Sequence, residues 1–281
     1  MPAIGFKCPN GDKVTFEQCF AGCDHQCMSL PALKATSQPH WFGKPSVTQL
    51  LAPTRIMYLQ IMNDFYLNPH GSIAAMIGTS MHAIMEDNCP DGWIMEKRLE
   101  DDITSGAFDA YDATTKTLYD FKNYGAYKVS QVLGYKARWV KRTVTRGKHA
   151  GEERWEQKFE PGGVRHVHDV ALQMNYYRIL MGKHGYPVEK MMVQVFVRGG
   201  LDKTAKSYGV TQPTYLVPIN PISDRWVRRY FEMKYKKLMD AVESGVVPEV
   251  CKPVERWNDR RCKDFCEVNE LCPYYQKNYM V

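Results

Sequence analysis

The sequence predicts an α/β protein with a mixed central sheet flanked by helices and with cysteine-rich segments at both ends. Three observations carry this prediction. One helical pattern is followed by three strands, a second by two more strands, and four cysteines lie in each terminal segment. Helices and strands that alternate in this way bury a sheet between helical layers.

Composition is that of an ordinary folded protein. The 281 residues are 44% hydrophobic and 24% charged, which is enough for a sizeable core. The formal net charge of +6 is modest. No leader-like apolar region opens the chain, and no stretch approaches the roughly 18 apolar residues of a membrane span. We therefore expect a cytoplasmic protein without a membrane partner.

The spacing of apolar residues predicts the elements in order. Ser46 is expected to cap a short helix that Pro53 ends. The elements after it are expected at about 54–66 (helix), 72–88 (helix), 93–99, 106–112 and 117–122 (strands), 167–184 (helix), 189–198 and 214–219 (strands), and 223–244 (helix). The predicted divisions are a cysteine-rich arm at 1–45, a core at 46–245 with a basic insertion at about 123–166, and a C-terminal cysteine segment at 246–281.

The stretch from Gly106 to Lys122 is the most informative part of the chain. Two apolar runs flank the turn-forming residues 112–116, which predicts a β-hairpin. This hairpin would bring Asp109, Asp120 and Lys122 to one end of a sheet. Such carboxylates need a paired charge or a metal, and their oxygens suit Mg²⁺ or Mn²⁺. A salt bridge on the surface of the hairpin is the alternative for these three residues alone.

Two helices add candidate site residues. Gly78 and His82 are one turn apart, so Gly78 would let the helix approach the sheet while His82 offers an imidazole nitrogen to the metal. The alternative is a buried or solvated histidine. Gln173 and Tyr177 are also one turn apart and can hydrogen-bond a phosphate, although such a pair is common on helices without a site.

The cysteines form two groups with the spacings C-x10-C-x3-C-x3-C and C-x10-C-x3-C-x5-C. Their members are Cys8, Cys19, Cys23 and Cys27 at the N-terminal end, and Cys251, Cys262, Cys266 and Cys272 at the C-terminal end. In a cytoplasmic protein such groups favour Zn²⁺ or an iron–sulfur cluster over disulfides or free thiols. Cys89 belongs to no motif, and we expect it to be a small buried residue.

A basic segment lies within the insertion. It contains no Asp or Glu between residues 136 and 148, and an aromatic ring is interleaved with the cations. The candidate DNA contacts are Lys136, Arg138, Trp139, Lys141, Arg142, Arg146 and Lys148. Cations neutralise phosphates and an exposed ring can stack on an unpaired base. The alternatives are a solvated basic loop and a Trp139 that belongs to the core.

Four motifs occur in order: Gly78-x3-His82, Gly106-x2-Asp109, Asp120-Phe-Lys122 and Gln173-x3-Tyr177. Together they resemble the RecB-like branch of the PD-(D/E)XK nuclease superfamily, which includes RecB-type helicase nuclease domains and RecB-like exonucleases associated with CRISPR or phage. The resemblance covers residues 72–198 for the core and extends to the C-terminus, since several members carry a cysteine-bound cluster there. It implies a restriction-endonuclease-like core.

The resemblance also implies roles. The catalytic residues would be His82, Asp109, Asp120, Lys122, Gln173 and Tyr177. Of these, His82, Asp109 and Asp120 would ligate Mg²⁺ or Mn²⁺, with the Phe121 carbonyl as a possible further ligand. Lys122 would position the attacking water, and Gln173 and Tyr177 would complete the site against the DNA backbone. Glu96 could add a carboxylate behind the ligands.

The cysteine pattern departs from that family. Its iron–sulfur members use one cysteine before the core and three after it, whereas this chain has four at each end. We expect a [4Fe–4S] cluster at the C-terminal group and a structural Zn²⁺ at the N-terminal group. Two Zn²⁺ sites, or one cluster shared by both ends, are the alternatives.

The expected function is therefore a metal-dependent exonuclease acting on single-stranded DNA or DNA ends, in recombination, repair, phage DNA metabolism or CRISPR spacer handling. The alternatives are a catalytically silent DNA-binding scaffold and a restriction-type endonuclease. No G-x4-G-K-[ST] motif occurs in the chain, so a helicase or recombination motor would be a separate partner.

Overall fold

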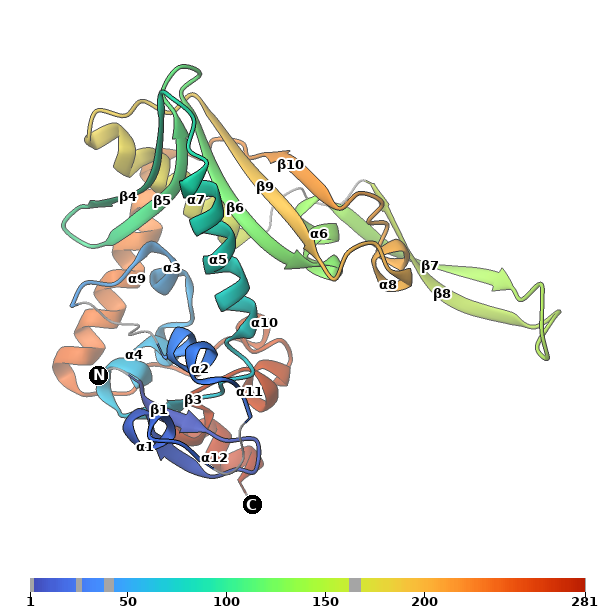
Figure 1. The fold of residues 1–281 in the computed structure, drawn as a ribbon, viewed down its shortest axis with the longest axis horizontal. Helices are drawn as coiled ribbons and strands as arrows, with labels where there is room; N and C mark the ends of the chain where they lie inside the picture. The colour runs from blue at the N-terminus through green and yellow to red at the C-terminus, as the bar shows by residue number, and fades with distance from the viewer. Residues whose placement is uncertain (1–2, 24–26, 38–42, 162–167, 281) are drawn as a thin grey trace. The chain divides into compact units, whose positions relative to one another are not determined.

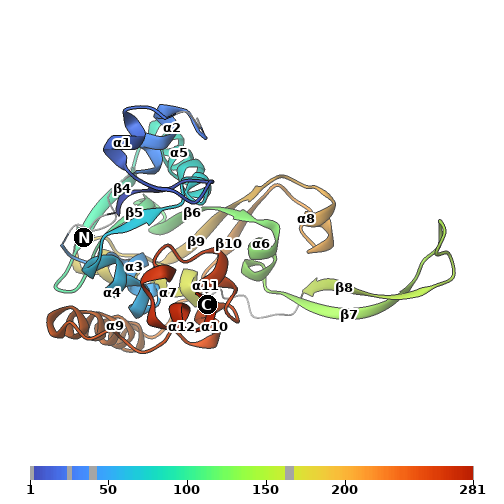
Figure 2. The same ribbon diagram turned by 90° about the horizontal axis from the view of Figure 1, so that it is seen from below.

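The computed structural model describes residues 3–23, 27–37, 43–161 and 168–280. The chain forms two compact units, shown from two directions in Figures 1 and 2. The first comprises Met1–Ile84, Arg98–Gly106 and Ser223–Val281, and the second comprises Met85–Lys97 and Ala107–Ile222. The structure is mixed α/β with helices flanking its sheets, as the sequence predicts.

The first unit contains a small three-stranded sheet and most of the helices. Its elements are β1 (Ala3–Lys7), β2 (Lys13–Thr15), α1 (Phe16–Phe20), α2 (Leu30–Thr36), α3 (Val47–Leu51), α4 (Thr54–Met62), β3 (Phe65–Leu67), α9 (Asp224–Ser244), α10 (Pro253–Arg256), α11 (Arg260–Asp264), the 3-10 helix η1 (Asn269–Leu271) and α12 (Pro273–Tyr279). β1 lies in the middle of the sheet, antiparallel to β2 and parallel to β3. The Ser46 side chain caps α3 as expected.

Helix α9 packs against α3 and α4 and confirms the helix expected at 223–244. Its buried residues are Val227, Phe231, Leu238 and Ala241, whose spacing forms one stripe along the helix. Gly245 ends it with φ of 69°, a left-handed conformation that glycine adopts at low cost.

The helix expected from 54 to 66 is wrong over its last four residues. α4 ends at Met62, where the Asn63 side chain donates to the Leu59 carbonyl at 3.0 Å and the Asn63 backbone turns extended. Phe65 and Leu67 are buried and belong to β3. Apolar residues two apart fit a strand as well as a short helical run, and pairing with β1 decides for the strand.

The second unit is built on a five-stranded mixed sheet in the order β10-β9-β6-β5-β4. Its strands are β4 (Trp93–Glu100), β5 (Ser105–Asp112), β6 (Thr117–Gly125), β9 (Lys190–Arg198) and β10 (Thr214–Pro218), the first residues of β5 and the last of β4 being counted in the first unit. β6 is antiparallel to β5 and parallel to β9, and β9 is antiparallel to β10. The turn between β5 and β6 forms where expected, because the Asp112 carboxylate accepts the backbone N–H groups of Thr114 and Thr115.

Helix α7 (His168–Lys183) is buried almost all round, from Val170 to Met181. A helix that is apolar on every side belongs inside a core, and α7 contacts β6 of the sheet. It places its polar residues close to the strands that carry the candidate site.

The insertion at about 123–166 is more regular than its polar sequence indicates. It contains the end of β6, helix α6 (Ala126–Val132) and a two-stranded hairpin of β7 (Tyr135–Thr143) and β8 (Glu153–Pro161). Both views show the hairpin extending away from the five-stranded sheet, with α8 (Lys203–Ser207) near its base.

Candidate functional site

Asp109 and Asp120 lie on neighbouring strands of the central sheet. Ala110 pairs with Tyr119 across β5 and β6, so the two aspartates flank this pair. Asp109 is 7% exposed and Asp120 is 2% exposed. One Asp109 oxygen, Oδ2, accepts the backbone N–H of Phe121 at 2.6 Å. The β5–β6 register therefore places two carboxylates together inside the sheet.

Asp120 is only partly satisfied by its surroundings. Its Oδ1 accepts a hydrogen bond from Lys122 Nζ at 2.6 Å, because residues two apart on a strand share a face. Its Oδ2 is buried and has no hydrogen-bond partner among the described residues. A buried carboxylate oxygen without a partner is costly, and a bound cation removes that cost. The donor set thus fits a hard divalent cation.

Lys122 remains a cation at this place. Burial by itself lowers the pKa of Lys122, but the Asp120 and Asp109 carboxylates raise it further than burial lowers it, so the net shift is upward. The arrangement presents a buried ammonium beside two carboxylates.

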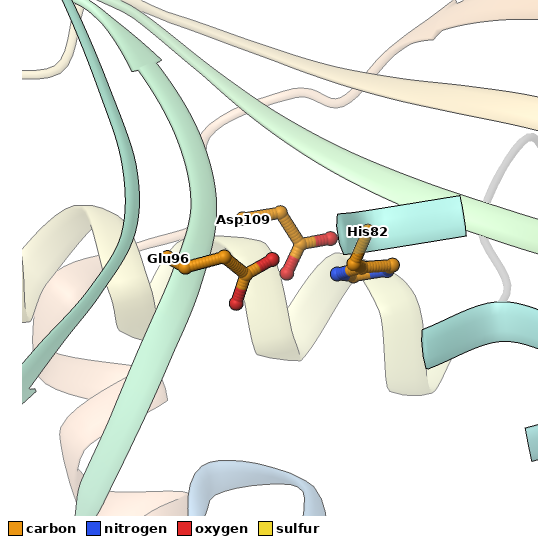
Figure 3. A group of neighbouring side chains, drawn as sticks. All are labelled: His82, Glu96 and Asp109. Carbon is orange, nitrogen blue, oxygen red and sulfur yellow. The ribbon is translucent and has the colours of Figure 1, made fainter. Parts of the chain in front are cut away.

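Potential metal ligands lie on β4 and β5 of the second unit. Glu96 and Asp109 each offer one ligand atom, and these atoms lie within 4.8 Å of each other. His82, which Figure 3 draws with them, lies on α5 (Ile73–Asp87), in the part of that helix that belongs to the first unit. Glu96, expected behind the ligands, is therefore itself a candidate ligand.

The backbone at Glu96 is unusual. Its φ is 46°, a left-handed conformation that a non-glycine residue in a strand seldom adopts. Such strain clusters at functional sites because it aims a side chain. No sequence pattern signals this conformation.

Helix α7 places Tyr177 near the carboxylates. Burial raises the pKa of Tyr177, and the Asp109 and Asp120 charges raise it further. Gln173, one turn earlier, hydrogen-bonds the Tyr177 side chain. The two α7 residues and the carboxylates therefore belong to one neighbourhood. At Gly78 the expected close packing is wrong, since an added Cβ would meet no described atom within 4 Å.

Tyr124 is a neighbour that the sequence analysis missed. Burial raises its pKa above the ordinary value, while Lys122 lowers it and Asp120 raises it. The sequence could have indicated Tyr124, because Asp120, Lys122 and Tyr124 are two residues apart on β6 and therefore share one face of the strand.

The four C-terminal cysteines line one pocket in the first unit, together with Arg55, Arg256 and Arg261. Arg55 Nη1 donates to Cys272 Sγ at 3.6 Å, and its Nε donates to the Pro248 carbonyl at 2.7 Å. Burial raises the pKa of Cys251 and of Cys266 to about 11, so a metal would have to displace their protons. Three cations beside four thiols favour an anionic thiolate centre.

The backbone before Cys262 is held in a strained form. Three consecutive residues, Trp257, Asn258 and Asp259, have φ of 53°, 52° and 71°. The Asp259 carboxylate accepts hydrogen bonds from the Tyr279 hydroxyl at 2.8 Å and the Tyr274 hydroxyl at 3.1 Å. These bonds fix the loop that leads into the cysteine pocket.

The N-terminal cysteines line a second pocket of the first unit. Cys8 sits at a tight turn, where its backbone N–H donates to the Asp12 carbonyl at 2.7 Å. Cys19 lies on α1, which the Thr15 side chain caps. Burial raises the pKa of Cys8 and of Cys19, and the neighbouring thiols of Cys23 and Cys27 raise both further. Each terminal group is therefore gathered around its own pocket.

Sulfur spacing bears on what these pockets hold. Tetrahedral Zn²⁺ with Zn–S bonds of about 2.3 Å places its sulfurs about 3.8 Å apart. All eight cysteines are described, and no three of them share a spacing of 4.8 Å or less. Both groups are more open than a loaded Zn²⁺ site. Cys89 is exposed, so the expectation that it is buried is wrong.

The predicted DNA-contact segment forms most of β7 and the turn after it. Cross-strand ion pairs join Lys141 to Glu153 at 2.9 Å and Arg142 to Glu156 at 3.2 Å, and Arg138 lies 3.6 Å from Glu160. No ion pair of Lys136, Arg146 or Lys148 is recorded within the described part of the chain. Trp139 is 62% exposed, so the alternative that it belongs to the core is wrong.

No protein-family model matches the chain, and no curated protein matches it significantly. Across the residues that the structure describes, no helix is both long enough and apolar enough to cross a membrane. The chemistry of the carboxylate site is therefore the basis for inferring a function.

Proposed function

We propose that this protein is a Mg²⁺- or Mn²⁺-dependent deoxyribonuclease with a PD-(D/E)XK core of the RecB-like type. The observation that carries the proposal is the buried Asp120 oxygen without a partner, set beside Asp109 and the Lys122 ammonium. A surface salt bridge would leave neither carboxylate almost fully buried. Carboxylates with an adjacent ammonium suit phosphodiester hydrolysis, in which negative charge develops on the phosphate.

The residues of the site would have three roles: metal ligation, stabilisation of charge on the phosphate, and orientation of the substrate. Asp109 and Glu96 would supply oxygen ligands, and the Asp120 oxygen without a described partner would supply a further one. His82 would supply a nitrogen ligand, as the resemblance implies. A bound divalent cation would neutralise the phosphate and lower the pKa of a coordinated water. Lys122, held by Asp120 Oδ1, would donate to a phosphate oxygen where charge develops. Tyr177 and Gln173 would orient the backbone of the substrate from α7.

DNA is the proposed substrate, as single strands or ends. The four ordered motifs resemble nucleases of that kind, and the β7–β8 hairpin carries more cations than carboxylates. Exonucleolytic action in recombination, repair, phage DNA metabolism or CRISPR spacer handling follows from the same resemblance. An unwinding motor would be a partner protein.

For the cysteine pockets we propose a [4Fe–4S] cluster at the C-terminal group and a Zn²⁺ at the N-terminal group. The three arginines that line the C-terminal pocket support the cluster, because they would offset the negative charge of a cluster bound by four thiolates. The tight turn at Cys8 supports a structural ion, and the N-terminal sulfurs would draw together on binding it.

The test is degradation of end-labelled DNA, single- and double-stranded, linear and circular, with Mg²⁺ or Mn²⁺. Lys122→Ala is expected to lower the cleavage rate by at least about 100-fold, while the protein stays folded and keeps its DNA binding. Its melting temperature should fall, because buried Asp120 loses its ion-pair partner. Lys236, an exposed lysine of α9 in the first unit, provides the control Lys236→Ala, which should retain activity.

Equal cleavage by parent and Lys122→Ala would contradict the proposed active site. No cleavage by anaerobically prepared parent, with DNA binding retained, would identify a silent binding protein instead. Cleavage of circular DNA at a defined sequence would identify a restriction-type endonuclease.

A further inference from the structure

The β7–β8 hairpin has two chemically different faces. Directly paired residues of an antiparallel ribbon point to the same side, and the pairs Trp139↔Gln157 and Lys141↔Trp155 alternate with pairs on the other side. Trp139 and Trp155 therefore share one face as diagonal neighbours. Each is 62% exposed, so both rings present their surfaces to solvent.

The opposite face is rich in cations. Its paired residues are Lys136↔Glu160, Arg138↔Lys158, Val140↔Glu156 and Arg142↔Arg154, which gives five cations and two carboxylates. Over residues 135–161 there are eight Lys or Arg and four Glu, so this stretch carries +4 of the chain's formal +6. The hairpin concentrates the positive charge of the molecule.

The base of the hairpin packs against the segment around Tyr208 and Gly209, whereas the tryptophans of its outer part are exposed to solvent. Phe159 packs edge-on against Tyr208 with ring centroids 4.8 Å apart. Gly209, with φ of 75°, lets Tyr135 approach so closely that an added Cβ would lie 3.0 Å from the Tyr135 ring. Tyr135 and Phe159 belong to the same face as the two tryptophans. That face is thus packed at its base and exposed beyond it.

From these observations we infer that the outer part of the hairpin binds unpaired bases of single-stranded DNA by stacking on Trp139 and Trp155. Trp155 was not among the residues singled out by the sequence. Every base offers a π face to an exposed ring, and the surrounding cations attract the phosphates that connect the bases. Lys141 Nζ, 5.7 Å from the Trp155 ring centroid, lies where it can attract the phosphate of a base that stacks on Trp155.

Charge complementarity selects this ligand over a protein surface. The cations of the hairpin outnumber its carboxylates two to one, and the exposed outer rings lie between charged residues. Duplex DNA would satisfy the cations but leave the rings without a partner, because its bases are stacked on each other. The inference takes DNA as ligand from the proposed function and adds the strand state that the hairpin recognises.

The experiment measures binding without cleavage. Lys122→Ala protein, without added divalent metal, is titrated into fluorescein-labelled oligothymidylate and into a duplex of equal length, at several salt concentrations. In this background Trp139→Ala with Trp155→Ala is compared with Trp139→Phe with Trp155→Phe. Trp226→Ala is the control, since Trp226 is an exposed tryptophan of α9 in the first unit.

The alanine pair is expected to weaken binding of the single strand at least about tenfold, because stacking contributes to affinity base by base. The phenylalanine pair should restore most of the loss. The dependence of affinity on salt should not change, since no cation is removed. Arg146→Ala with Lys148→Ala should instead flatten that dependence for both DNA forms.

Parental affinity of the alanine pair for the single strand would overturn the inference. An equal loss for single strand and duplex would overturn it too, because the rings would then serve no strand preference. Absent nuclease activity with a tryptophan-dependent single-strand affinity would refute the proposed reaction and leave the hairpin inference standing. Metal-dependent cleavage by the parent, together with an affinity that does not depend on the tryptophans, would support the proposed reaction and refute the hairpin inference.

Discussion

At the scale of single residues, Asp120 carries an unusual combination of burial and incomplete bonding. It is 2% exposed, Lys122 satisfies one oxygen, and the other oxygen has no described partner. Leaving a buried carboxylate oxygen without a partner costs free energy, and a bound cation would offset that cost. The left-handed Glu96 backbone is a second local cost in the same sheet.

Asp120→Asn tests cation binding independently of DNA cleavage. The amide keeps the size of the side chain and removes its charge, so Mg²⁺ affinity should fall. At a Mg²⁺ concentration about 100-fold above the dissociation constant, the parent should gain about 2.7 kcal/mol and melt about 5–10 °C higher. The variant should show a much smaller rise in thermal melts recorded with and without Mg²⁺.

Asp112→Asn is the matched control, because Asp112 is also a buried carboxylate but its partners lie in the β5–β6 turn. It should lower stability while retaining the Mg²⁺-dependent rise. If Asp120→Asn kept the full rise, Asp120 would not contribute to a cation site.

At the scale of elements, α7 is both the central helix of its unit and the carrier of Tyr177. Asn175 is fully buried on it, and its amide donates to the Ala171 carbonyl at 2.9 Å and to the Asn220 carbonyl at 3.1 Å. Its Oδ1 accepts the Ile222 N–H at 2.8 Å. One side chain therefore ties the segment after β10 to the helix.

Asn175→Ala is expected to lower the free energy of unfolding by about 2–4 kcal/mol, because two carbonyls and one N–H lose a buried partner. Denaturant unfolding followed by circular dichroism measures the change. Asn278→Ala is the control: Asn278 donates to the carbonyl four residues earlier, as Asn175 does, but is exposed, and its loss should cost less than 1 kcal/mol. Similar costs for both variants would refute the anchoring role of Asn175.

At the scale of the whole molecule, two kinds of chemistry belong to different compact units. Both cysteine pockets lie in the first unit, whose small sheet is only three strands wide. The buried carboxylates and Lys122 lie in the second, on the five-stranded sheet. We therefore expect metal at the cysteines to stabilise the first unit, as metal does for folds with little core of their own.

Cys266→Ser should remove iron from anaerobically purified protein, abolish its visible charge-transfer absorption and leave zinc in place. Cys19→Ser should remove zinc and leave iron. Elemental analysis and absorption spectra of both variants measure this, with Cys89→Ser as the control at an exposed cysteine outside either group. Iron that survives Cys266→Ser, or zinc in place of iron in the parent, would refute the proposed cluster.

Much of the element order was predictable because it depends on neighbours in sequence. The helix at α9 follows from apolar residues at helical spacing, and the β5–β6 turn follows from Asp112 and the residues after it. The same local logic placed Asp120 and Lys122 on one strand face. Local spacing failed after α4, because Phe65 and Leu67 fit either a continued helix or a strand. Only the pairing of β3 with β1 decides for the strand.

The sequence by itself determined the mixed α/β class, the hairpin that joins Asp109 to Asp120, and the two cysteine groups, because each depends on short spacings and turn residues. Only the tertiary structure decided that Glu96 lies beside Asp109, that Glu153 and Glu156 pair with the basic strand, and that Trp139 and Trp155 share a solvent-exposed face. Strand register and backbone conformation place those residues, and both are fixed by packing and hydrogen bonds between segments that are distant in sequence.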